Sequence, residues 1–158
     1  HIGGVMINKT AGIDLTHIPY KGAGPATADL VAGQVELMVS SPPAVSAHIR
    51  NGNLKALASD KRHPAFPDIP TTAEAGLPGL KLDAWFALFA PAGTPQPIVD
   101  RLNAAMRKTA KLDVVVARAN ELGTFLVDWS PQQVDKFVQA ELDDWAKLIK
   151  ENKITLTE

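Results

Sequence analysis

The chain has 158 residues, which is enough for one domain or for two small lobes with a hydrophobic core. Its formal net charge is −1, so no excess of basic residues favours nucleic acid as a partner. No apolar run is long enough to span a bilayer, and the lack of cysteine excludes disulfides, thiolate chemistry and cysteine-ligated zinc without fixing the compartment.

The first twelve residues, HIGGVMINKTAG, show neither an initiating methionine nor the basic, apolar and small-residue order of a signal peptide. They have instead the character of residues inside a helix. We therefore expect the chain to be a fragment of a longer protein.

Short apolar segments then alternate with helical patterns. Strands are predicted at residues 15–20, 35–40 and 54–59, and helices at residues 25–32 and 43–50. Single helices connect these strands, and such connections are typical of parallel crossovers. The front half is therefore predicted to be α/β, with a parallel-rich sheet and right-handed crossovers.

The middle of the chain begins with a segment rich in proline and charge, DKRHPAFPDIP at residues 60–70, which we expect to be a loop. The next residues, PTTAEAG, predict a single short helix. Thr71 is its expected N-cap, Glu74 the reciprocal partner in a capping box, and Gly76 the residue that ends it.

The rest of the chain is rich in helix patterns. Residues 81–91, KLDAWFALFAP, predict a longer apolar strand, and residues 124–128 a short one. A helix is expected behind Thr94 as N-cap with Pro95 in its first turn, and another at residues 112–122. The change in composition near residues 81–85 predicts a boundary between two lobes.

The last helix has the clearest pattern. Ser130 is its expected N-cap, Pro131 its first residue and Gln133 the capping-box partner. A stripe at helical spacing is expected to be buried: Val134, Val138, Leu142, Trp145 and Ile149.

A glycine-rich loop precedes the helix expected at residues 25–32. Because Gly22, Ala23 and Gly24 lack bulky side chains, the peptide N–H groups at this helix start stay accessible, and they suit a carboxylate or phosphate. The same residues also suit a tight turn with no ligand at all. The motif is not a dinucleotide fingerprint, because GAGPAT lacks the third glycine, and no Gly-Lys-Ser/Thr of a P-loop follows.

A second candidate lies at the end of the next predicted strand. Ser40 and Ser41 place small hydroxyls where ligands often bind in open α/β sheets, and Ser41 before two prolines is equally suited to cap a helix. Lys21 has two interpretations as well, attraction of an anion or exposure to water. The histidines do not fall at a metal-ligand spacing, and no Gly-x-Ser-x-Gly motif accompanies the serines. Neither a metal nor a catalytic group is expected, and the tryptophans are interpreted as core anchors.

Three blocks carry a resemblance to a known family: PYKGAGPATADLVAGQVELMVSSPPAVSAHIRNGNLKALA, FPDIPTTAEAGLPG and WFALFAPAGTPQPIVDRLNAAM. In this order they resemble the substrate-binding receptors of tripartite tricarboxylate transporters, also called the Bug family of periplasmic solute receptors. The resemblance runs over nearly the whole chain. It implies a two-lobed, type II periplasmic-binding-protein-like fold, the "Venus flytrap", which is incomplete here.

The implied function is capture of a small organic acid, such as a di- or tricarboxylate, in the periplasm, without cofactor or chemistry. Membrane transporter subunits are the implied partners. By analogy, residues 1–83 are most of the second lobe, and residues 84–158 are the crossing strand and the helix-rich tail of the first lobe.

The resemblance also implies ligand-binding residues. One ligand loop of the family matches Tyr20, Lys21, Gly22, Ala23, Gly24, Pro25 and Ala26. Ser40 and Ser41 occupy a neighbouring strand end, where many relatives carry an acid or an amide. The serine pair leaves open whether an amino group of the ligand is recognised.

Two other functions stay open. An α/β enzyme could use the same anion pocket, although no base, nucleophile or metal set lies near the loop. Alternatively, the fragment is a structural module whose apolar faces pair with another copy in a homo-oligomer. If the first part of the receptor is missing, residues 84–158 are expected to expose an apolar face unless another chain covers it.

Overall fold

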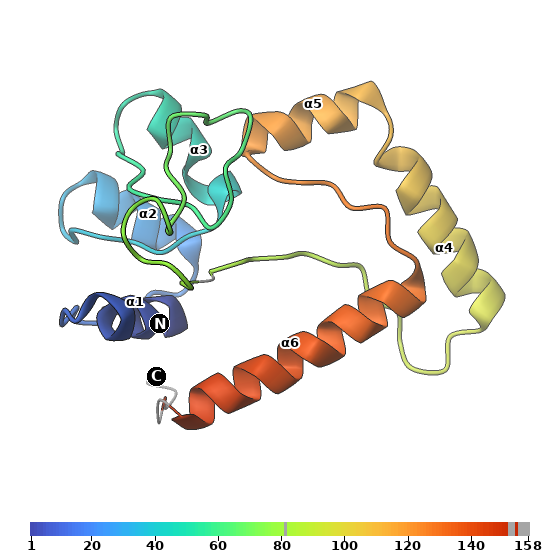
Figure 1. Cartoon of the computed structure of the whole chain (residues 1–158). Coiled ribbons are helices and arrows are strands. Elements are labelled where there is room, and N and C mark those ends of the chain that lie inside the picture. The colour runs from blue at the N-terminus through green and yellow to red at the C-terminus, as the bar shows by residue number, and fades with distance from the viewer. Residues whose placement is uncertain (81, 152–153, 155–158) are drawn as a thin grey trace. The chain divides into compact units, whose positions relative to one another are not determined.

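The computed structural model describes residues 1–80, 82–151 and 154, and six helices lie within this part of the chain (Figure 1). In chain order they are α1 (Ile2–Ala11), α2 (Ala23–Val31), α3 (Pro42–Arg50), α4 (Gln96–Thr109), α5 (Asp113–Leu122) and α6 (Pro131–Glu151). The chain forms two compact units. The first comprises the described residues of 1–84 together with 120–124, and the second comprises those of 85–119 and 125–154.

Apart from the short helix expected after residue 70, the predicted helices are confirmed, with shifts of up to two residues at their starts. The largest shift is in α2, which begins at Ala23 rather than Pro25. In α4 the N-cap is Pro95, while the Thr94 hydroxyl donates to the carbonyl oxygen of Pro91 over 2.7 Å instead of capping the helix. The helical character of the first twelve residues is confirmed by α1, which ends at Gly12 in the left-handed conformation, φ 66°.

The five predicted strands are absent from the described residues, so the parallel-rich sheet of the front half is not seen. Residues 15–20, 35–40, 54–59 and 82–91 run as irregular connecting segments, and residues 124–128 do the same; residue 81 lies outside the described residues. A strand requires a neighbouring backbone about 4.8 Å away in addition to an apolar pattern. Ser59 alone among these segments forms a parallel bridge, and its partner is Thr71.

The short helix expected after residue 70 is also wrong, although its capping box forms. The Thr71 N–H donates to Glu74 Oε2 over 2.7 Å, and the Glu74 N–H donates back to Thr71 Oγ1 over 3.3 Å. The backbone completes one helical turn, in which the Ala75 N–H donates to the Thr71 carbonyl, and then stops. Gly76, φ 89°, and Pro78 follow too closely for a second turn.

Close contacts surround Gly123 within the first unit. Gly123 is buried with φ 71°, and a Cβ added there would lie 2.9 Å from the ring of Phe66 and 3.1 Å from Pro42 Cβ. The Phe66 ring is held in turn by the guanidinium of Arg50, 4.8 Å from its centroid. Glycine is therefore required at this position both by backbone conformation and by packing.

An aromatic cluster joins α6 to the segments around it in the second unit. The ring centroid of Phe137 lies 5.4 Å from that of Trp85 and 5.1 Å from that of Trp129. The indole N–H groups of Trp85 and Trp145 both donate to Glu141 Oε2, over 3.1 and 3.0 Å. The predicted core position of the tryptophans is wrong, because Trp85 is exposed and Trp129 and Trp145 are half-buried. Their rings nevertheless pack around α6, and two of their indole N–H groups share one acceptor.

Apolar side chains of the second unit remain largely uncovered. Phe86 is 79 % exposed, and Leu88, Phe89, Phe125 and Val127 are exposed as well. The predicted burial of the α6 stripe is wrong: Val134, Val138 and Trp145 are half-buried, while Leu142 and Ile149 are exposed. Helical spacing puts these side chains on one face of α6. Their burial also requires other apolar side chains to cover that face, and the described residues cover only part of it.

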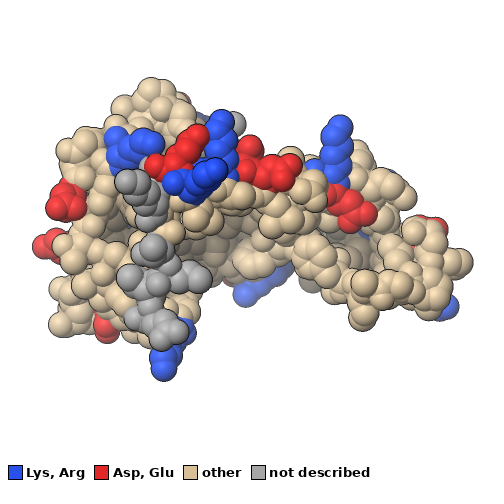
Figure 2. Space-filling model, turned by 90° about the horizontal axis from the view of Figure 1, so that it is seen from below, with Lys and Arg blue, Asp and Glu red and all other residues tan. Residues whose placement is uncertain are grey.

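Charged residues are distributed without a large patch of one sign on the face that Figure 2 shows. Several form ion pairs at the surface, among them Arg62 with Glu74 and Arg107 and Lys111 with Asp128. Among the described helices, none is both long and apolar enough to cross a membrane.

The acid dependence of stability is expected to include a contribution from Glu74. The Arg62 guanidinium and the Thr71 N–H and hydroxyl hold the pKa of its carboxyl at about 2. Because this pKa is lower in the folded state, the stabilisation is present above pH of about 4, the range of an unfolded glutamate, and is lost as the pH falls toward 2. Thermal melts should therefore show a lower melting temperature for Glu74→Gln at pH 6 and a shrinking difference below pH of about 4. Glu36→Gln, at an exposed glutamate, is the control, and a difference that stays constant with pH would contradict the assignment.

Candidate functional site

The start of α2 is built by glycine. Gly22 is the N-cap with φ 109° and ψ 174°, a conformation that residues with a side chain rarely adopt. Ala23 and Gly24, expected from the sequence to precede the helix, instead form its first turn. This corrects the predicted helix start and moves the helix N-terminus into the glycine-rich loop itself.

Three backbone amides at this end have no partner within the helix. The first four N–H positions of an α-helix lack intrahelical acceptors, and here they belong to Gly22, Ala23, Gly24 and Pro25. Pro25 has no N–H, so three donors remain. Within the described part of the chain no side chain caps this helix, and its first turn holds no acidic residue. The positive end of the helix dipole is therefore uncompensated.

The predicted loop residues surround these donors at the surface. Lys21, Gly22, Ala23, Gly24 and Pro25 are exposed, Tyr20 is half-buried, and Ala26 is buried beneath the first turn. A Cβ added at Gly24 would meet no heavy atom within 4 Å. An anion thus has space to reach the amides.

The start of α3 differs chemically from that of α2. Ser41 is the N-cap, in extended conformation, and Pro42 and Pro43 follow it. Neither proline has an N–H, and the Ala44 N–H is already bonded to the Ser41 carbonyl over 3.1 Å. The predicted N-cap position of Ser41 is confirmed, but its hydroxyl makes no capping hydrogen bond. Half-buried Ser40 and Ser41 therefore offer hydroxyl groups rather than a row of amides.

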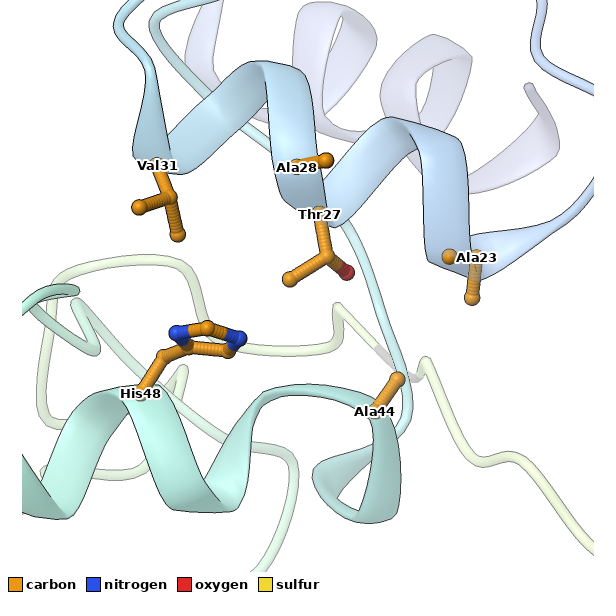
Figure 3. A pocket seen from close by; sticks show the side chains of 7 residues that line it. Ala23, Thr27, Ala28, Val31, Ala44 and His48 are labelled. Carbon is orange, nitrogen blue, oxygen red and sulfur yellow. The ribbon is translucent and has the colours of Figure 1, made fainter.

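A cavity of about 500 Å³ lies between α2 and α3 (Figure 3). It is lined by Ala23, Gly24, Thr27, Ala28, Val31, Ala44 and His48. Figure 3 shows Thr27 and Val31 on α2 pointing toward α3, and the imidazole of His48 on α3 pointing toward α2. The Thr27 hydroxyl faces Met38 Sδ at 3.8 Å, which leaves His48 as the main polar side chain of the lining.

The structure unites only part of the predicted site in this cavity. Ala23 and Gly24 are predicted ligand-binding residues that also line the cavity. The other predicted residues, Ser40 and Ser41 among them, do not line it. Five lining residues were missed from the sequence: Ala28, and two pairs at a spacing of four, Thr27 with Val31 on α2 and Ala44 with His48 on α3. This spacing marks one face of each helix and is the signal that pairs them.

Sequence reasoning also missed Asp29. The Tyr20 hydroxyl donates a hydrogen bond to Asp29 Oδ2 over 2.8 Å. This bond raises the pKa of Tyr20 above its ordinary value. Nine positions separate the two residues, so no local motif indicates the contact.

Metal-ligand clusters are not found among the described residues: none groups three or more His, Asp or Glu side chains in a metal-binding arrangement. His63 is buried, where its Nδ1 accepts a hydrogen bond from the Ala65 N–H over 3.0 Å. His1 and His17 stack on each other with centroids 4.2 Å apart. The histidine side chains thus serve packing, apart from His48 in the cavity.

Comparison with known proteins gives a consistent family. Residues 1–154 match the family model described as the tripartite tricarboxylate transporter family receptor. The chain is 37% identical over 157 residues to the UPF0065 protein in the tcbD-tcbE intergenic region of Pseudomonas sp. strain P51, covering 98% of this chain and 47% of that protein. It is 37% identical over 153 residues to protein BugT of Bordetella pertussis, covering 96% and 47%.

Solved structures agree with this match. The R. palustris protein Rpa4515, solved with adipate, superposes with a TM-score of 0.90 at 32% identity, covering 98% of this chain and 52% of that one. The periplasmic binding protein BugD gives a TM-score of 0.88 at 34% identity, covering 98% and 53%. MatC from Rhodopseudomonas palustris, with bound malate, gives a TM-score of 0.80 at 37% identity, covering 94% of this chain and 52% of that one. The chain thus has the fold of part of a periplasmic binding protein and spans about half the length of these relatives.

Proposed function

Because the chain belongs to the tripartite tricarboxylate transporter receptor family, we propose that it is the carboxy-terminal part of a receptor that captures a small organic acid. The family consists of solute-binding receptors rather than enzymes. The ligand class is a di- or tricarboxylate, the compartment is the periplasm, and the partner that takes up the acid is a tripartite tricarboxylate transporter. Relatives solved with adipate and with malate support the carboxylate.

The observation that carries this proposal is the open start of α2. Its three unpaired amides and the positive end of the helix dipole form a binding site for one carboxylate group. No acidic side chain of the first turn competes for these donors. Charge-assisted hydrogen bonds to a carboxylate are about twice as strong as neutral ones, so a few amides suffice.

The residues proposed to bind the ligand divide by role. The amides belong to Gly22, Ala23 and Gly24, and the flanking residues Tyr20, Lys21, Pro25 and Ala26 shape and charge the loop. Ser40 and Ser41 supply hydroxyls at the start of α3, where prolines replace amide donors. Such hydroxyls suit a hydroxyl or second carboxylate of the ligand.

The proposed lobes follow the division of the chain. We assign residues 1–83 to the second lobe and residues 84–158 to the crossing strand and the tail of the first lobe. The change of compact unit after Ala84 supports this boundary, while residues 120–124 belong to the first unit and depart from it. The uncovered apolar side chains of the second unit are proposed to pack against the remainder of the receptor. Residues 15–20, 35–40 and 54–59 are irregular here, and we propose that they form the parallel strands of the second lobe where the rest of the receptor supplies the neighbouring backbone.

Calorimetric titration of the receptor that contains this chain tests the function. We expect malate, adipate or citrate to bind with a dissociation constant of about 1 μM or lower, which corresponds to about −8 kcal/mol. The methyl ester of the bound acid with every carboxylate esterified, which lacks all of the negative charges, should show no binding. Equal heats for acid and ester, or none for any acid, would contradict the proposal.

Light scattering tests the cover of the apolar face. The complete receptor should be monomeric, because its own remainder covers the exposed side chains of the second unit. A homo-oligomer whose dissociation exposes these side chains would instead favour a second copy as the cover.

A further inference from the structure

The hydrogen bond between Tyr20 and Asp29 spans the start of α2. Tyr20 is the last residue before the exposed loop, and Asp29 lies in the second turn of the helix. Both side chains are half-buried, and the hydroxyl donates to the carboxylate over 2.8 Å. The segment between them, residues 21–28, contains the N-cap and all three unpaired amides.

We infer that the Tyr20–Asp29 hydrogen bond is a clasp that holds residues 21–24 in the conformation in which their amides bind a carboxylate. The inference rests on the proposed function and deepens it, because it makes Asp29 a positioning residue that does not touch the ligand. Tyr20 then acts through Asp29, since its hydroxyl proton is already donated to that carboxylate.

Residues 21–24 need such a constraint because their own side chains make few contacts that would order the loop. Gly22 and Gly24 carry no side chain, and a Cβ added at either position would meet no heavy atom within 4 Å. The fixed conformation of a glycine-containing loop costs conformational entropy. A clasp that orders the loop before the ligand arrives removes this cost from binding and strengthens it.

If only charge mattered, Asp29 would weaken anion binding, whereas a clasp would strengthen it. Its carboxylate adds a negative charge to the helix whose start is proposed to bind an anion, so Asp29→Asn should strengthen binding if charge were the only effect. The clasp predicts weaker binding, because the neutral amide replaces a charge-assisted hydrogen bond by an ordinary one. The sign of the change therefore separates the two explanations.

A ligand-free measurement tests the clasp first. Tyr20 is the only tyrosine of the sequence, so the near-ultraviolet absorbance of tyrosinate reports on this residue alone in the 158-residue chain. The hydrogen bond to Asp29 raises the pKa of Tyr20. We expect the ionisation midpoint to fall in Asp29→Asn and the amides of residues 22–24 to exchange faster with solvent. An unchanged midpoint and unchanged exchange would overturn the inference.

A double-mutant cycle then tests the effect on binding, with malate and adipate as probes of the receptor. Tyr20→Phe and Asp29→Asn should each weaken binding by about three- to tenfold. The double variant should bind no more weakly than Tyr20→Phe alone, because Asp29→Asn weakens the same hydrogen bond that Tyr20→Phe removes. Asp143→Asn is the control: this carboxylate accepts a hydrogen bond from Gln139 over 3.1 Å on α6, and its loss should not change affinity.

The outcomes distinguish this inference from the proposed function. Tighter binding by Asp29→Asn, or additive losses in the cycle, would overturn the clasp while dicarboxylate binding stands. A receptor that binds neither acid would contradict the proposed function, and the tyrosinate titration and amide exchange would still decide on the clasp. If Asp29→Asn does not fold, Tyr20→Phe supplies the exchange measurement.

Discussion

Gly24→Asp is expected to weaken binding of malate or adipate by about tenfold to thousandfold while leaving the melting temperature unchanged or slightly higher. Gly24 is the second residue of α2, and a Cβ there meets no heavy atom within 4 Å. The fold therefore admits the side chain, and a carboxylate in the first turn interacts favourably with the helix dipole. A bound carboxylate, in contrast, meets a like charge and loses access to the amides.

Calorimetric titration of the receptor, with thermal melts in the absence of ligand, separates binding from folding. Gly24→Asn is the matched control, because it adds nearly the same volume without the charge, and it should lose less affinity than Gly24→Asp. Full affinity in a folded Gly24→Asp variant would show that the glycines serve the turn alone.

Gly123→Ala is expected to destabilise the chain by about 2 to 5 kcal/mol, the largest stability effect predicted here. Two costs combine at this position: φ is 71°, and the new Cβ would lie 2.9 Å from the Phe66 ring and 3.1 Å from Pro42 Cβ. The ring cannot move away without leaving the Arg50 guanidinium, and the proline carbon belongs to a rigid ring at the start of α3. The melting temperature should fall by about 5 to 15 °C.

Gly12→Ala provides the control for Gly123→Ala. Gly12 has a similar φ of 66°, but an added Cβ there would meet nothing within 4 Å. Its substitution should therefore cost only the backbone strain, about 1 to 2 kcal/mol. Equal losses at both positions, measured by chemical denaturation, would show that packing at Gly123 contributes nothing.

Helix starts were predictable because their signals are local. Ser130 and Gln133 form the expected capping box, with the Ser130 N–H donating to Gln133 Oε1 over 2.8 Å and the Gln133 N–H donating to Ser130 Oγ over 3.3 Å. Such motifs lie within four residues, so the sequence contains all partners. The box at Thr71 and Glu74 shows the limit of this reasoning, because it forms equally well around a single turn.

Strands and burial were not predictable to the same degree, since both depend on distant partners. The apolar pattern of residues 35–40 is real, yet a ladder requires another backbone beside it, and none pairs with it among the described residues. Leu142 has the correct helical spacing and is nevertheless 59 % exposed. Spacing determines which face a side chain shares, while the cover of that face comes from elsewhere.

The candidate site could be predicted from the sequence in part, less well than the helix starts and better than the strands. Glycine and proline indicated the exposed loop before α2, because their backbone properties act at their own positions. Asp29 and His48 were missed because their roles depend on contacts with Tyr20 and with the facing helix. The prolines of α3 were visible in the sequence, and their effect on donor number follows once the helix start is known.

The aromatic cluster around Phe137 has a consequence for spectroscopy. Trp85, Trp129 and Trp145 are the three tryptophans of the sequence, and all belong to the second unit, whereas Tyr20 belongs to the first. Tryptophan fluorescence therefore follows the unfolding of one unit, and tyrosine absorbance that of the other. Coincident denaturation curves from the two probes would show a single cooperative transition, and separated curves would show that each unit unfolds by itself. The chain thus carries an optical label for each of its halves.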